Sequence, residues 1–224
     1  MKWDWGKHCK LFNPWYKHME GIVIQLQKDA LDDSIDIETL LRKAFLVARK
    51  LNLEDFKKWI LEEQNGYNNK VPDYRMIHGE IYGWNPYHGW VPVIMDGEFK
   101  DILSTMPIGT SIASISDAYK NSDGNISLTL NGKVTQFLNK SCNGQTKYCM
   151  QTSKSELNRI LCAVRNKILD WAILLEENGI VGVGLSFNNE EKEIASINKC
   201  IYNYTNNFYS KVDQVQIEQA DELK

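Results

Sequence analysis

The sequence predicts an α+β fold dominated by helices, in which three N-terminal helices pack on a long C-terminal helix beside a small antiparallel β element. Apolar residues recur at helical spacing in 17–65 and again in 154–178. The segment between them contains short, proline-interrupted runs that are typical of strands. We expect one domain over 17–188, preceded by an aromatic arm (1–16) and followed by a polar linker or tail (189–224).

The composition is that of an ordinary globular domain. Hydrophobic residues make up 43% and charged residues 25% of the chain, and the net charge is −3. No segment is strongly basic, which argues against nucleic acid as a partner. The chain opens without an apolar signal segment and contains no run of about 18 apolar residues, so we expect a cytoplasmic protein without a membrane span. The five cysteines form no C-x-x-C motif or Cys/His cluster, so we expect no metal and no cofactor.

The first three helices are expected at 17–31, 37–51 and 52–65. Asp36 is a good N-cap for the second helix, and Asn65-Gly66 is a typical end for the third. Links of a few residues then make an antiparallel series of helical hairpins.

The middle of the chain changes periodicity. Residues 76–83 and 90–95 are expected to form short strands, which their prolines confine to sheet edges or strand ends. Residues 97–106 and 107–119 are expected to form two short helices, the second with proline in its first turn.

Residues 125–138 carry the strongest β-hairpin pattern in the chain. A two-residue turn at Asn131-Gly132 would divide the apolar residues between the two faces of the hairpin. A three-residue loop ending at Gly132 instead sets Leu128 opposite Val134, and we favour this second register.

The longest helix is expected over 154–178. The motif Ser153-Lys-Ser-Glu156 resembles a capping box, and Gly179 ends the helical pattern. The glycine series 179–184 has the spacing of a phosphate-binding loop. It follows a helix, however, and lacks the Lys-Ser/Thr pair, so we interpret it as a helix stop and an irregular connector.

The stretch 82–90, YGWNPYHGW, contains four large aromatics, a histidine and a proline within nine residues. We interpret it as a rigid aromatic brace whose tryptophans insert into the helical core, because Pro86 fixes the turn and the glycines let the backbone bend. Its rim is then the best place for contact with a partner. The predicted binding residues are Trp84, Asn85, Tyr87, His88 and Trp90.

Three residues are candidates for catalysis: Arg75, His78 and Glu80. A single strand over 76–81 would place His78 and Glu80 on one face, where they could act as base and orienting group or as two metal ligands. The alternative, which we favour, is the exposed polar face of a half-buried strand.

Glu62 and Glu63 lie near the end of a predicted helix, where the helix dipole disfavours carboxylates. We therefore expect an arginine partner, with Arg165 of the long helix as the candidate, and we interpret the pair as a structural tie between helices.

Four blocks stand in order along the chain: IVIQLQKDALDDSIDIETLLRKAFLVARKLNLEDFKKWILEEQNGY, VPDYRMIHGEIYGWNPYHGWVPV, MPIGTSIASI and LCAVRNKILDWAILLEENGIVGVGLSF. Together they resemble the AbiTii domain of bacterial abortive-infection (anti-phage defence) proteins, over roughly 20–190. The resemblance implies antiviral defence in the bacterial cytoplasm but brings no catalytic residues with it.

Two functions are compatible with this resemblance. The first is a sensing or interaction module that works through protein–protein contacts, with a phage or host component as the partner. The second is a growth-arresting toxin enzyme that acts on nucleic acid or nucleotides, and whether the chain is an enzyme stays open. The aromatic arm adds a further alternative, because its side chains suit either self-association or packing back on the helical core.

Overall fold

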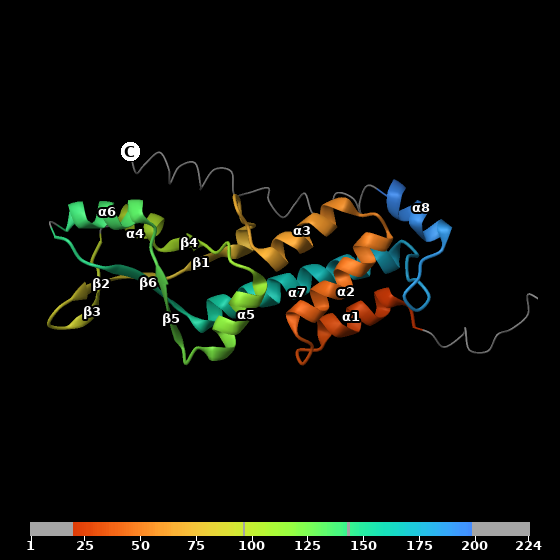
Figure 1. The fold of residues 1–224 in the computed structure, drawn as a ribbon, viewed down its shortest axis with the longest axis horizontal. Helices are drawn as coiled ribbons and strands as arrows, with labels where there is room; N and C mark the ends of the chain where they lie inside the picture. Colours follow the sequence, from red (N-terminus) through yellow and green to blue (C-terminus); the bar gives the residue numbers. More distant parts are fainter. Residues whose placement is uncertain (1–19, 96, 143, 199–224) are drawn as a thin grey trace, which may run out of the picture.

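The computed structural model describes residues 20–95, 97–142 and 144–198 (Figure 1). Its helices are α1 (Ile22–Leu31), α2 (Ile37–Lys50), α3 (Glu54–Asn65), the short η2 (Asp73–Arg75), α4 (Gly97–Leu103), α5 (Ile112–Asn121), α6 (Gly132–Ser141), α7 (Lys154–Glu177) and α8 (Asn189–Ile197). Its strands are β1 (Met76–His78), β2 (Glu80–Asn85), β3 (Gly89–Pro92), β4 (Thr105–Pro107), β5 (Asn125–Thr129) and β6 (Tyr148–Ser153). The predicted α+β fold, mainly helical, is confirmed.

The helical end of the molecule contains the larger core. Helix α1 packs along α7, and α2 and α3 complete the array (Figure 1). Phe56 of α3 stacks on Trp171 of α7, with 3.8 Å between the ring centroids. Asp36 caps α2 as predicted, since its side chain accepts a hydrogen bond of 3.0 Å from the Glu38 N–H. Helix α3 ends at Gly66, whose φ of 95° is a conformation that favours glycine.

The other end of the molecule is a four-stranded antiparallel sheet in the order β3-β2-β6-β5. Helices α4 and α6 cover one face of this sheet (Figure 1). A second, smaller core lies between these helices and the sheet. It includes Ile81, Leu103, Leu138, Tyr148 and Met150. Strand β6 leads directly into α7, so one continuous segment joins the two ends.

The predicted hairpin at 125–138 is wrong. Strand β5 pairs with β6, which sequence analysis did not predict, and Gly132 begins a helix. Asn131 acts as the N-cap of α6, because its side chain accepts a hydrogen bond of 2.9 Å from the Val134 N–H. An Asn-Gly pair suits a tight turn, but asparagine is an equally good helix N-cap, and the apolar residues that follow pack on the smaller core.

The predicted strand at 76–83 is divided at Gly79. Strand β1 pairs with β4, whereas β2 pairs with β3 and β6. The Gly79 N–H donates to the Ser104 carbonyl at 2.9 Å. A Cβ atom at Gly79 would lie 2.5 Å from the Gln151 carbonyl oxygen, so the close approach of the two backbones requires glycine here.

The helices expected at 97–106 and 107–119 both exist with different limits. The first ends at Leu103, and the following residues form β4. The second begins at Ile112, because the side chain of Ser111 accepts a hydrogen bond from the Ser114 N–H and caps the helix there.

The predicted capping box at the start of α7 does not form. Ser153 makes no side-chain cap, and Glu156 instead accepts a hydrogen bond of 3.0 Å from the His78 N–H. Arg159 pairs with Glu156 at 3.0 Å and donates to the carbonyls of Tyr74 and Met76. The first turns of α7 therefore hold η2 and β1 in place.

The contacts of Glu156 with His78 and Arg159 should make a pH-dependent contribution to the free energy of unfolding. Burial opposes ionisation, but the hydrogen bonds from Arg159 and His78 hold the pKa of Glu156 below its ordinary value. The stabilisation is therefore present above the pKa of the unfolded chain and is lost as pH falls through the lower folded pKa. We expect Glu156→Gln to lower the free energy of unfolding by about 1 kcal/mol at pH 7. Urea titrations from pH 7 to pH 3 check this, and a difference from wild type that does not shrink with acid would contradict it.

The glycine connector after α7 binds a carboxylate of the chain itself. Gly179 and Gly182 have φ values of 77° and 75°. The N–H groups of Val181 and Gly182 donate to Glu191 Oε1 of α8 at 3.0 and 2.7 Å. An intramolecular carboxylate thus occupies the donors that a phosphate would need, in agreement with a structural connector.

Helix α8 lies within the stretch expected to be a linker or tail, and the Asn188–Glu191 capping box begins it. The limit of the domain at 188 stays a prediction. The aromatic arm and the part of the tail after 198 lie outside the described residues. Among the residues that are described, no helix combines the length and apolarity needed to cross a membrane.

Candidate functional site

The hairpin β2–β3 lies at the far end of the sheet from the helical core (Figure 1). Trp84 pairs with Trp90 and Asn85 with Gly89 in the strand register. The Asn85 side chain closes the loop, since its Oδ1 accepts hydrogen bonds from the N–H groups of Tyr87 and His88 at 2.9 and 3.2 Å. Gly89 has a φ of 73°, which lets the chain return into β3.

The prediction that the hairpin tryptophans insert into the helical core is wrong. Trp84 and Trp90 contact each other edge to face, with 5.5 Å between ring centroids, and are 43% and 39% exposed. Side chains alternate along a strand, so Trp84 lies on the face opposite Ile81, which packs in the smaller core. The tryptophans therefore lie on the face that α4 and α6 leave uncovered.

We call this uncovered face of the four-stranded sheet the open face. It is bordered by Tyr87 at the hairpin tip, which is 92% exposed. Strand β5 contributes exposed polar side chains at alternate positions. The strand register and alternation place these residues on the open face: Glu80, Tyr82, Trp84, Trp90, Ser127, Thr129 and Gln151.

Arg75, a catalytic candidate, is fully buried in an ion pair with Glu63. Its guanidinium also donates to the carbonyl oxygens of Ile108 and Thr110, at 3.3 and 2.6 Å. The Tyr67 hydroxyl donates to Glu63 at 2.6 Å, and burial together with the Glu63 carboxylate raises the pKa of Tyr67. These contacts hold the segment after α3 against the helical array.

The expected arginine partner for the end of α3 exists, but it is Arg75 and not Arg165. Arg165 donates to the carbonyls of Asp29, Asp32 and Ile35, so it binds the link between α1 and α2. The segment after α3 turns back and brings Arg75 beside Glu63, a path that helical spacing does not reveal.

His78 and Glu80 lie in different surroundings. His78 is exposed in β1, where its Nδ1 lies 3.2 Å from Thr105 Oγ1. Glu80 is exposed in β2, on the open face of the other sheet. The structure thus separates both residues from buried Arg75. In the described part of the chain, no group of three or more His, Cys, Asp or Glu side chains could hold a metal ion.

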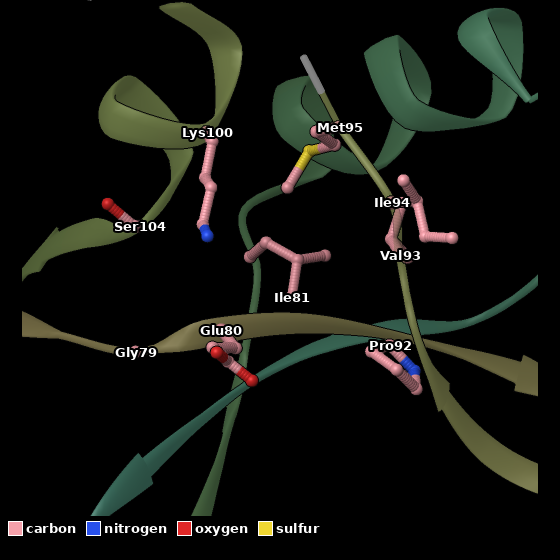
Figure 2. A pocket seen from close by; sticks show the side chains of 9 residues that line it. All are labelled: Gly79, Glu80, Ile81, Pro92, Val93, Ile94, Met95, Lys100 and Ser104. Carbon is pink, nitrogen blue, oxygen red and sulfur yellow. The ribbon is translucent and has the colours of Figure 1, made fainter. Parts of the chain in front are cut away.

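A pocket of about 240 Å³ lies on the opposite side of β2 from the open face (Figure 2). The start of β2, the segment that leaves β3, and α4 with the residue that follows it form its walls. Its lining residues are Gly79, Glu80, Ile81, Pro92, Val93, Ile94, Met95, Lys100 and Ser104. The sequence does not reveal this pocket, because it forms only when α4 folds over the sheet.

Comparison with known proteins identifies a family for this chain. No curated protein and no solved structure matches the chain. The AbiTii family model matches residues 21–199, which include every helix and strand described above. The family implies abortive-infection defence against phages. The chain belongs to the AbiTii family.

Proposed function

We propose that the domain acts in abortive-infection defence as a sensing or interaction module, and that it contacts a protein partner through the open face and the β2–β3 hairpin. The observation that carries this proposal is the exposed Trp84–Trp90 pair on a sheet face that no described helix covers. Tryptophan and tyrosine are enriched at the centres of protein interfaces, where they supply most of the binding free energy.

The hairpin is built to present these side chains rigidly. Asn85 fixes the loop by two hydrogen bonds to its backbone, and the Thr146 hydroxyl donates to the Trp84 carbonyl at 2.6 Å. A preorganised surface loses little conformational entropy on binding, which favours affinity. The two tryptophans contact each other, and an exposed apolar cluster of this kind is typical of a protein interaction site.

The test is the protection that the protein gives to bacteria against phages. We expect the double variant Trp84→Ser/Trp90→Ser to lose protection, with the free energy of unfolding lowered by no more than about 2 kcal/mol because both side chains are partly exposed. Plating efficiency of a phage panel measures protection, and urea denaturation measures stability.

The matched control is Leu31→Ser, at an exposed apolar position on the helical end. It should protect as well as wild type. If the double tryptophan variant is folded, equally abundant and fully protective, the proposed contact surface is wrong.

The partner is a phage or host protein, or a second copy of the chain. Light scattering on purified protein distinguishes the last of these. A dimer that becomes monomeric in the double tryptophan variant identifies the open face as a self-association surface.

A growth-arresting enzyme acting on nucleic acid or nucleotides is the second candidate. The observation in its favour is His78, which is exposed and has its ring nitrogen held by Thr105. Expression of His78→Ala and Glu80→Ala, with growth and nucleotide pools as readouts, tests it. If both variants arrest growth and protect as wild type does, these residues have no catalytic role.

A further inference from the structure

The pocket beside β2 has apolar walls and one positively charged lining residue, Lys100. Figure 2 shows the side chain of Ile81 rising from β2 into the space between Lys100 and Met95. Val93 and Met95 complete the apolar wall, and Pro92 and Ile94 lie at its margin. The ammonium group of Lys100 points from α4 toward β2, along one side of this space (Figure 2).

The size of the pocket limits its occupant. Pockets for drug-sized ligands and cofactors have volumes of about 300–1,000 Å³. The volume of about 240 Å³ is smaller, and the pocket opens to the surface beside Ile94, which is 97% exposed. One large aliphatic side chain from a partner segment fits these dimensions better than a cofactor does.

The charges around the pocket favour an acidic neighbour for that side chain. Lys100 is the one cation among the lining residues, and among the carboxylates whose side chains the structure describes, none forms an ion pair with it. Glu80 also borders the pocket, but its carboxylate lies on the other side of the β2 ribbon from Ile81 (Figure 2). A carboxylate placed at the Lys100 side of the pocket would gain a charge-assisted hydrogen bond.

The edge of the sheet argues for recognition through side chains. Strand β3 is an edge strand, and the Val93 N–H donates to the Ile81 carbonyl at 2.9 Å. Because hydrogen-bonding positions alternate along a strand, the backbone of Pro92 faces outward, where proline offers no N–H group. A partner strand paired with β3 would find no N–H donor at Pro92, so addition of a strand along β3 is disfavoured.

We propose that this pocket binds a partner segment that carries a leucine- or isoleucine-sized side chain directly beside an acidic side chain. The aliphatic group packs against Ile81, Val93 and Met95, and the carboxylate binds the Lys100 ammonium group. The proposal rests on the proposed function, since it names the chemistry of the protein partner, but it assigns a separate subsite on the covered side of the sheet.

Backbone-amide NMR spectroscopy of the full chain tests it, with four N-acetylated, C-amidated peptides as probes: Gly-Leu-Glu-Gly, Gly-Ala-Glu-Gly, Gly-Leu-Gln-Gly and Gly-Leu-Lys-Gly. We expect Gly-Leu-Glu-Gly to shift the amide signals of Ile94, Lys100 and Ser104 and to bind at least fivefold more tightly than the other three. Lys100→Ala should weaken its binding about five- to tenfold.

The charge-reversal variant Lys100→Glu provides the matched control. Position 100 is exposed, so the variant should fold, and its preference should invert toward Gly-Leu-Lys-Gly. Equal binding of the glutamate and glutamine peptides to wild type, or an unchanged preference in Lys100→Glu, would overturn the proposal.

The outcomes separate this proposal from the proposed function. Loss of phage protection in the tryptophan double variant, together with no peptide selectivity, would leave the interaction module in place and reject the subsite. Selective peptide binding with full protection by the tryptophan variant would establish the subsite and reject the open face as the functional surface.

Discussion

Replacing Arg75 by alanine should lower the free energy of unfolding by about 3–5 kcal/mol. Arg75 and Glu63 form an ion pair in which both side chains are completely buried. The variant leaves the Glu63 carboxylate without its counter-charge in the protein interior, and it also removes the donors to the carbonyls of Ile108 and Thr110. Urea denaturation at pH 7 measures the change.

The control is an ion pair of the same chemistry at the surface. Arg42 and Glu38 pair at 2.9 Å on α2, with side chains 67% and 41% exposed. Arg42→Ala should change stability by less than about 1 kcal/mol, because water screens the pair. If Arg75→Ala lowered the free energy of unfolding as little as Arg42→Ala does, the buried Arg75–Glu63 ion pair would not exist. Arg75 would then again be a catalytic candidate.

Replacing Trp171 by alanine should lower the free energy of unfolding by about 3–5 kcal/mol. Its indole ring is fully buried and stacks on Phe56 between α7 and α3. Removal of the ring leaves a cavity at the centre of the larger core, and the helices around it can collapse only in part.

The matched control is Trp84→Ala, the same substitution on the open face. It should cost about 1 kcal/mol or less, because that ring is 43% exposed and loses one edge-to-face contact. Parallel thermal unfolding of both variants checks the contrast. Equal destabilisation would mean that the hairpin tryptophans are core residues after all.

The helices could be predicted from the sequence because their evidence is local. The apolar stripe of α2 and its cap at Asp36 lie within one short segment, and both are present in the structure. The region 125–138 could not, since Asn131-Gly132 is compatible with a turn and with a helix start. The sequence does not reveal strand β6, because most of its residues are buried and the alternation that marks a half-exposed strand is absent.

The composition of the sequence points to the hairpin but not to its surroundings in the fold. The hairpin residues were identified by their unusual composition, but which face they occupy depends on how α4 and α6 cover the sheet. Arg75 was chosen for its chemistry, and its burial beside Glu63 follows from the path of the segment after α3. Lys100 had no distinguishing sequence pattern, because its importance arises only from the pocket that it borders.

We propose that the hairpin end of the molecule makes the functional contact while the helical end maintains the fold. A photo-crosslinking amino acid in place of Tyr87, compared with the same amino acid in place of Leu31, tests this claim in phage-infected bacteria. Both positions are highly exposed, at 92% and 70%; Tyr87 lies in the β2–β3 loop and Leu31 at the end of α1 in the helical array. We predict an infection-dependent protein adduct at position 87 and none at position 31. An adduct at position 31 alone, in a protein that still protects the cell, would contradict this assignment of the contact to the hairpin.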